Sequence, residues 1–458
     1  MKTVFSFICL LLITQVVVAQ PVSKKLEDAV KSLEADSQLK SAIIGFCVVD
    51  QNGAVVFDKN AKLGLAVASS QKVITSAASL ELLGINYRYK TELAYNGRID
   101  NGTLNGNIYI IGYGDPTLGS WRYGNTKEKL VLNKWMQSLK QVGIKQQNGS
   151  IIGFDKNWES QTIPGGWIWD DIGNYYGSGV SALNWRENQY DLNLKPGNKE
   201  GDTVIIVSTE PTVTGINLTN ELKTSKPGSG DNGYIYLPPY STNGFVRGTI
   251  PAGKKSFTIS GAVPNPAAQL AYVFKNEMQQ QGIMLNEPDI HNEQPQLPKV
   301  IHLLTTLSPP LDSINYWFLK KSINLYGETL VKTLGYEKKY EGTTKAGIDI
   351  IKSFWQKNGI DPISINIIDG SGLSPGNRVT PEALIKVMQY AKSRPWFNSF
   401  YNALPEINGI KMKSGSINGA RSFTGYVGNY TFAIVINNYN GSPSEIVRKM
   451  YRLLDILK

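Results

Sequence analysis

The pattern of apolar residues changes twice along the chain, and these changes restrict the possible folds more than any other feature. The first part alternates helical and strand spacing, with elements expected at 23–36, 43–49, 54–57 and 69–83. Short strands, turns and polar clusters follow from about 88 to 300. Helical spacing returns at 266–281, and the last expected elements are helices at 311–335 and 443–457 and strands at 411–417, 421–427 and 431–437. The sequence therefore predicts one α/β domain that is built from both chain ends and split by a long β-rich insertion.

Residues 1–19 have the layout of a secretory signal. Lys2 precedes an apolar run that ends in small residues at Ala19. Thr14 and Gln15 interrupt this run, which is already short for crossing a bilayer. We therefore expect a signal peptide that is removed, leaving a soluble protein exported to the periplasm without a stable membrane span.

The formal net charge of +10 does not by itself indicate a nucleic-acid partner. Lys and Arg are dispersed among acidic residues, and no basic tract with interleaved aromatic residues occurs. A modest positive surface equally suits an anionic polymer such as a cell wall, and solubility alone accounts for it as well. The chain has two histidines, His291 and His302, which leave little room for a His-rich metal site. We expect no metal, no organic cofactor and no nucleic-acid partner.

A serine nucleophile needs a base, and one possible arrangement is rejected on physical grounds. Residues Gly372–Gly376 match the pattern G-x-S-x-G, with Ser374 at the nucleophile position. In such a turn the next residue donates its N–H to the oxyanion, but Pro375 has no N–H. The histidine of such sites usually follows the serine, and no histidine follows His302.

Lysine is the other possible base, in the pattern S-x-x-K. Residues three apart are neighbours on a helix, and burial with nearby positive charge can lower a lysine pKa enough for catalysis. The pattern occurs at Ser37–Lys40, which suits a solvated helix end, and at Ser69–Lys72, which precedes an apolar run. Taken alone, the second pair fits an ordinary core helix about as well as a catalytic site.

An S-x-N pattern supplies a polar pair that can relay a proton and hold a substrate amide. Ser322 and Asn324 lie between two helical stretches, where a short loop would direct both side chains into a cleft. The pattern alone is weak, because it also begins at Ser313, Ser364 and Ser416.

A K-S-G pattern lies on the expected strand at 411–417. Lys413 offers a cation for a substrate carboxylate, and Ser414 can add a hydrogen bond to it. Gly415 leaves room for a substrate backbone to approach the strand. The N–H of Ser416, paired with that of Ser69, could form an oxyanion hole.

With these three motifs in this order, the sequence resembles the penicillin-recognising serine enzymes. About 250 residues separate Ser69 from Ser322, and this long insertion resembles the DacB-type D-alanyl-D-alanine carboxypeptidase/endopeptidases, the penicillin-binding protein type 4 family. Further local matches extend along nearly all of the chain after residue 19. They are Ala68–Thr75, Gly112–Leu118, Gly166–Asp171, Ser308–Leu311, Asn324–Glu328 and Asp369–Ser374.

The resemblance implies a transpeptidase-like domain with an antiparallel sheet and helices, interrupted by two inserted domains. The implied boundaries are 20–87 and 296–458 for the catalytic domain, 88–188 and 265–295 for the inserted domain, and 189–264 for a smaller domain nested within it. Two residues depart from the family pattern: Ser414 replaces the common Thr, and Pro375 stands where Arg is frequent. Asp171 and Tyr176 could meet an amine-bearing side chain of the stem peptide, although an Asp in a polar loop is usually solvated or capping.

The activity implied by the resemblance is cleavage of peptidoglycan stem peptides through an acyl-enzyme. Ser69, Lys72, Ser322, Asn324 and Lys413 would be catalytic, and β-lactam antibiotics would acylate Ser69. Two alternatives stay open: a β-lactamase or related serine esterase, which would clear a penicilloyl adduct quickly, and a non-catalytic wall-binding protein, which would not be labelled by penicillin. Nucleic-acid binding is a distant third.

Overall fold

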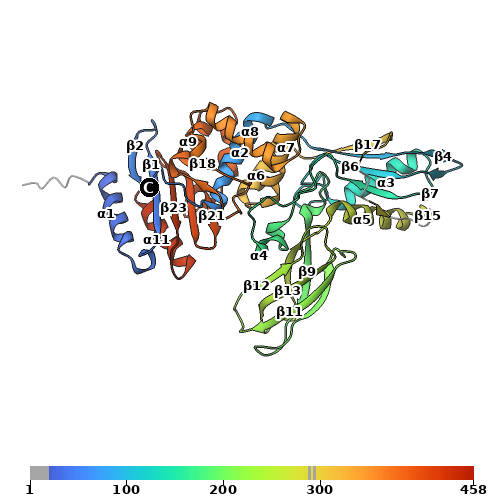
Figure 1. The fold of residues 1–458 in the computed structure, drawn as a ribbon, viewed down its shortest axis with the longest axis horizontal. Coiled ribbons are helices and arrows are strands. Elements are labelled where there is room, and N and C mark those ends of the chain that lie inside the picture. The colour runs from blue at the N-terminus through green and yellow to red at the C-terminus, as the bar shows by residue number, and fades with distance from the viewer. Residues whose placement is uncertain (1–19, 287–289, 292–295) are drawn as a thin grey trace, which may run out of the picture.

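The computed structural model describes residues 20–286, 290–291 and 296–458, so the expected signal peptide lies outside the described residues. The molecule is elongated (Figure 1): helices and a sheet from both chain ends form one end, and inserted β-rich parts extend away from it. We call the first part the terminal domain and the rest the insertion. Within the described residues no helix is both long and apolar enough to cross a bilayer.

One six-stranded antiparallel sheet joins the two ends of the chain in the terminal domain. Its order is β2-β1-β23-β22-β21-β20. The strands are β1 Ile43–Val49, β2 Val55–Lys59, β20 Glu406–Ile407, β21 Ile410–Ile417, β22 Ala420–Val427 and β23 Tyr430–Asn437. The N-terminal strand β1 pairs along its whole length with β23, so neither end can form this sheet alone.

Helices bury both faces of this sheet, which explains why β1 is almost continuously apolar. Phe46 and Val48 pack under α1 (Val22–Glu34) and α11 (Pro443–Asp455), whereas Cys47 and Val49 face the opposite core. That second core contains six helices: α2 Lys72–Leu83, α6 Leu311–Lys320, α7 Asn324–Lys339, α8 Thr344–Lys357, α9 Pro381–Lys392 and α10 Phe397–Ala403. The predicted α/β domain with an antiparallel sheet and a β-rich insertion is confirmed.

The insertion has its own sheets and cores. Two sheets have the orders β16-β8-β6-β3-β17 and β15-β7-β5-β4. Their strands are β3 Lys90–Tyr95, β4 Arg98–Asp100, β5 Thr103–Asn105, β6 Ile108–Gly112, β7 Gln146–Asn148, β8 Ile151–Phe154, β15 Met284–Asn286, β16 Ile290–His291 and β17 Ile301–Leu307. Helices α3 (Glu128–Gln141) and α5 (Pro266–Gln280) share a core with them.

A smaller pair of three-stranded sheets, β10-β9-β14 and β11-β13-β12, surrounds a separate apolar core. Its strands are β9 Gln189–Lys195, β10 Ile205–Glu210, β11 Asn217–Ser225, β12 Asn232–Tyr236, β13 Asn243–Pro251 and β14 Phe257–Ala262. These strands lie together below the rest of the insertion in Figure 1.

One expected boundary was placed too early in the chain. Residues from 296 onward were assigned to the catalytic domain, but β17 pairs with β3 in the sheet of the insertion. Trp135 Nε1 also donates a hydrogen bond of 2.9 Å to Thr306 Oγ1 of this strand. A strand belongs to the sheet that completes its hydrogen bonds, so the chain returns to the terminal domain only after β17. The other boundaries stay predictions.

Candidate active site

A cleft of about 640 Å³ opens where the insertion meets the terminal domain, and most of the predicted site residues line it. They are Ser69, Ser322, Asn324 and Ser416 from the terminal domain, and Asp171 and Tyr176 from the insertion. The structure therefore brings together motifs that lie far apart in the sequence. The alternative pair, Ser37 and Lys40, is exposed and does not line the cleft.

Ser69 lies in a 3₁₀ turn, Ala68–Gln71, directly before α2. The Nζ atom of Lys72 lies 2.9 Å from Ser69 Oγ, 2.6 Å from Asn324 Oδ1 and 2.7 Å from the carbonyl oxygen of Ser371. All three contacts are neutral oxygens. Burial lowers the pKa of Lys72 to about 7, an effect that the charges of Asp369 and Glu328 only partly oppose. Near neutral pH a large fraction of Lys72 is therefore a free amine that can accept the Ser69 proton.

Two buried carboxyl groups that no motif singled out lie near Lys72. Glu328 accepts hydrogen bonds from the N–H of Gly370, at 3.0 and 3.2 Å. Burial raises the pKa of Glu328, and the charge of Asp369 adds to this effect. Asp369 accepts from Gln71 Nε2, Trp167 Nε1, Asn377 Nδ2 and the N–H groups of Gly372 and Ser374. These contacts hold the loop whose Ser371 carbonyl contacts Lys72.

Ser322 and Asn324 stand where α6 ends and α7 begins. Ser322 has φ 57°, a left-handed conformation that is uncommon outside glycine and is concentrated at functional sites. Asn324 contacts Lys72 through Oδ1, and its Nδ2 donates 2.8 Å to the carbonyl of Tyr176. Because that carbonyl can only accept, the insertion fixes the orientation of the Asn324 amide.

Strand β21 lies against the turn that carries Ser69. The Ser70 hydroxyl donates a hydrogen bond of 3.2 Å to the carbonyl of Lys413. Lys413 Nζ donates 2.7 Å to the carbonyl of Ser414. Burial lowers the pKa of Lys413 well below its usual value, and the neighbouring charge of Lys72 lowers it further. The two lysines thus disfavour a double positive charge in the site.

The glycine of the K-S-G motif has a packing role that the sequence did not reveal. A Cβ at Gly415 would lie 2.2 Å from the carbonyl oxygen of Val67 and 2.3 Å from Ser422 Oγ. Glycine therefore allows β21 to approach the Ser69 turn. The expectation that Gly415 leaves room for a substrate backbone stays a prediction beside this packing requirement.

Asp171 and Tyr176 enter the cleft from the insertion, the first from α4 (Trp169–Ile172) and the second from the following turn. Burial raises the pKa of Asp171 to about 6, and the charge of Asp170 adds to this rise. A hydrogen bond with Tyr176 acts in the opposite direction and lowers the pKa. Asp171 is therefore mainly ionised at neutral pH.

Other cleft residues were not foreseen from the sequence. Arg421 and Tyr439 line the cleft, and Arg421 lies opposite Ser416 in the pairing of β21 with β22. The residue of β22 that lies beside the cleft depends on how β22 is aligned with β21. No motif in this sequence indicates that strand register.

The rejected serine arrangement does not form a nucleophilic site. Ser374 is 1% exposed, and its hydroxyl donates 2.9 Å to the carbonyl of Gly166. His302 lies on β17, where its ring contacts Thr305 at 2.9 Å, and the side chain of His291 lies outside the described part. Among the described residues, no group of three or more His, Cys, Asp or Glu side chains is arranged to hold a metal ion.

Comparison with known proteins agrees with this geometry. The D-Ala-D-Ala carboxypeptidase 3 (S13) family matches residues 26–410 of the chain. The chain belongs to this family. It is therefore a hydrolase of the D-Ala-D-Ala carboxypeptidase class, and the predicted resemblance to DacB-type enzymes is confirmed.

Two curated relatives cover most of the chain. A D-alanyl-D-alanine carboxypeptidase of Actinomadura sp. (strain R39) is 25% identical and aligns over 91% of this chain and 82% of its own length. D-alanyl-D-alanine carboxypeptidase DacB of Haemophilus influenzae is 26% identical, over 88% of this chain and 87% of its own length.

A solved structure, penicillin binding protein 4 (dacB) from H. influenzae, has a TM-score of 0.79 at 22% identity and covers 94% of this chain and 98% of its own. The same protein in complex with a novel β-lactam has a TM-score of 0.74. At this identity the two structures support the fold, including its insertions.

Proposed function

We propose that this carboxypeptidase cleaves peptidoglycan stem peptides through an acyl-enzyme on Ser69. The observation that carries the proposal is the Lys72 amine, 2.9 Å from Ser69 Oγ, with a pKa lowered to about 7 by burial. A serine hydroxyl becomes a useful nucleophile only when a neighbouring base takes its proton. The contacts of Lys72 with Asn324 and Ser371 keep the amine in position for this step.

In the acylation step, Ser69 Oγ attacks the carbonyl carbon of the penultimate D-Ala or of a D-alanyl cross-link, and its proton passes to Lys72 Nζ. The N–H groups of Ser69 and Ser416 would bind the oxyanion, and loss of one such donor costs about 3 kcal/mol in comparable sites. The C–N bond then breaks, and Ser322 relays the proton from Lys72 to the departing amine. The products of this step are a free amine, terminal D-Ala or the cross-linked partner, and an ester on Ser69.

Deacylation reverses the roles with water as the nucleophile. A water molecule transfers one proton to Lys72 while its oxygen attacks the ester carbonyl. The bond to Ser69 Oγ breaks, and Ser69 regains a proton from Lys72. The net reaction consumes one water and uses no metal or organic cofactor.

Substrate recognition would involve both parts of the molecule. Lys413 and Ser414 would receive the terminal carboxylate, whose charge would favour the ammonium form of the buried lysine. Asp171 and Tyr176, on the insertion side, would meet the amine of the diamino acid in the stem peptide. β-Lactams would acylate Ser69, and the site of action would be the periplasm after export.

The test is release of D-Ala from a soluble stem pentapeptide, together with labelling by a fluorescent penicillin. Wild type and Ser37→Ala should release D-Ala and take the label, because Ser37 belongs to the exposed S-x-x-K pair. Ser69→Ala should lose both. Equal D-Ala release from Ser69→Ala would remove Ser69 from the chemistry, and rapid loss of the penicillin label would favour the β-lactamase alternative.

A further inference from the structure

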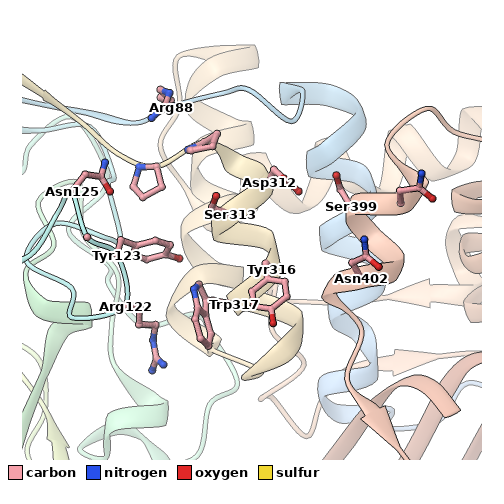
Figure 2. A pocket seen from close by; sticks show the side chains of 14 residues that line it. Arg88, Arg122, Tyr123, Asn125, Asp312, Ser313, Tyr316, Trp317, Ser399 and Asn402 are labelled. Atoms are coloured by element: carbon pink, nitrogen blue, oxygen red, sulfur yellow. The ribbon is translucent and has the colours of Figure 1, made fainter. Parts of the chain in front are cut away.

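A second cavity, of about 740 Å³, lies outside the catalytic cleft and shares no lining residue with it. Figure 2 shows its parts: Arg122, Tyr123 and Asn125 come from the insertion, α6 lies in the middle, and Ser399 and Asn402 come from α10. The cavity therefore forms a groove that extends from the insertion across α6 to α10. The mechanism above uses none of these side chains, and of the family matches only Ser308–Leu311 reaches the groove, through Pro309 and Pro310.

Aromatic rings form one part of the groove. Tyr316 and Trp317 lie next to each other, with ring centroids 5.3 Å apart, and Tyr316 is 37% exposed. The guanidinium of Arg122 lies 5.5 Å from the Trp317 ring, and its Nε pairs with buried Glu187 at 2.9 Å. The ion pair with Glu187 fixes the position of Arg122. Its guanidinium therefore holds the Trp317 ring from the side of the insertion through a cation–π contact.

The rest of the groove is polar and has free hydrogen-bonding capacity. Within the part of the chain that the structure describes, the side chains of Asn125, Ser313, Asn398 and Asn402 form no hydrogen bond with the protein. Each amide offers both donors and an acceptor. Polar groups that converge on a concave surface beside aromatic rings are typical of small-molecule and polymer subsites.

We propose that this groove binds the amino-sugar strand of the peptidoglycan whose peptides the catalytic cleft cleaves. A pyranose ring offers an apolar face for Tyr316 and Trp317, and hydroxyl and acetamido groups for the asparagines. The inference rests on the proposed function, because only that substrate carries sugars and stem peptides on one polymer.

Other ligand classes fit the groove less well. A phosphate group favours clustered cations, but Arg122 already pairs with Glu187, and the remaining cation, Arg88, shares the groove with the carboxylate of Asp312. A peptide that binds by strand addition needs a free strand edge, whereas helices and loops make the walls of this groove. A peptide that packs on the rings instead is an outcome of the test below. The saccharide therefore remains the ligand that uses both the rings and the neutral amides.

Helix α6 connects the groove to the catalytic cleft. It presents Ser313, Tyr316 and Trp317 to the groove and ends at Lys320, two residues before Ser322. A sugar strand bound along α6 would thus be held by the same element that leads into the site. Attachment of the polymer at this second point would raise the local concentration of its stem peptides at Ser69.

The experiment measures binding without catalysis, in the Ser69→Ala background. The probe is peptide-free glycan strand from which all stem peptides have been removed enzymatically, and titration calorimetry gives the Kd. Tyr316→Ala with Asn402→Ala should weaken binding by about tenfold or more, since tenfold corresponds to about 1.4 kcal/mol. The matched control is Tyr340→Ala, whose ring is 89% exposed and lines neither cavity.

Each outcome decides the proposal. Equal glycan affinity of the double variant and of Tyr340→Ala would overturn it. Tighter binding of a free acidic peptide than of the glycan, measured in the same way, would also overturn it. If thermal unfolding shows that the double variant is destabilised, Asn402→Ala alone, an exposed position on α10, replaces it under the same criteria. Since the Ser69→Ala background performs no chemistry, a failure of D-Ala release in wild type would overturn the proposed function and leave this binding result intact.

Discussion

Two buried lysines in the terminal domain, Lys72 and Lys332, show how the same residue type serves two different purposes. Both side chains have no exposed surface, and burial lowers the pKa of both. Lys332 Nζ lies 3.2 Å from a carboxylate oxygen of Glu159 and donates 2.6 Å to the carbonyl of Gln161. Lys72 contacts three neutral oxygens instead.

The difference is the presence of a carboxylate within contact distance. Glu159 opposes the effect of burial on the pKa of Lys332 and favours its ammonium form. The ion pair between the two side chains therefore links the insertion, which carries Glu159, to α7. Around Lys72 the nearest carboxyl groups act only through space, and the amine can lose its proton near neutral pH. Of these two lysines, Lys72 has no ion-pair partner and contacts Ser69, so it is the candidate base, whereas Lys332 has a partner and is structural.

Replacement of Lys72 should have the largest effect. Lys72→Met keeps the volume of the side chain but removes the base, so penicillin acylation and D-Ala release should fall by about 10²–10⁴-fold. Stopped-flow measurement of acylation gives the rate. A loss below tenfold would contradict the assignment of Lys72 as the base.

Lys332→Met tests the other half of the comparison. It leaves Glu159 without its buried partner, and because Glu159 is 24% exposed, we expect a loss of about 1–3 kcal/mol in the free energy of unfolding. Urea unfolding measures this loss. The acylation rate of the folded variant should stay within threefold of wild type, and a loss as large as that of Lys72→Met would erase the distinction between the two lysines.

The sequence indicated much of this site because each catalytic motif is local. Ser69 and Lys72 lie on one turn, and the return of helices and strands after the β-rich stretch predicted a domain built from both ends. The buried carboxyl groups of Glu328 and Asp369 were not given roles, since Glu328 and part of the Asp369 network have partners on distant segments, Gly370, Gln71 and Trp167. The packing role of Gly415 was also missed, because it depends on how close Val67 comes in the folded chain.

Apart from the helix expected at 266–281, which the structure confirms as α5, the insertion was predicted only as a β-rich region. Helix α3 was overlooked, although Val131, Trp135 and Leu139 recur at helical spacing and are buried. Its apolar face packs against a sheet whose strands are only two to seven residues long in the described part. In such a region, short strand patterns on both sides obscure a single amphipathic helix.

The pH dependence of acylation sharpens the comparison further. The pKa of Lys72 is lowered to about 7, so the amine is protonated below that pH, and the rate should fall about tenfold per unit as the pH decreases. Above pH 7 the rate should level off. Between about pH 7 and the usual value of 10.5, the unfolded chain holds a proton that the native Lys72 has lost, so this group makes the free energy of unfolding rise with pH.

The pH profile of Lys332→Met serves as the control for this measurement. Its rate should show the same midpoint near pH 7 as wild type, because Lys332 contacts neither Ser69 nor Lys72. A midpoint that moves by a unit or more in this variant would mean that the titrating group is not Lys72 alone.

The smallest expected effect concerns Asp171, on the insertion side of the cleft. Asp171→Asn keeps the size of the side chain and removes its charge, so KM should rise several-fold for stem peptides that carry a side-chain amine and stay unchanged for peptides without it. Because burial raises the pKa of Asp171 to about 6, wild type should lose this preference as the pH falls through 6, while Asp171→Asn should show no such change. A preference that persists at pH 5 in wild type would assign amine recognition to another group and leave Asp171, like Lys332, a residue of structure rather than of substrate binding.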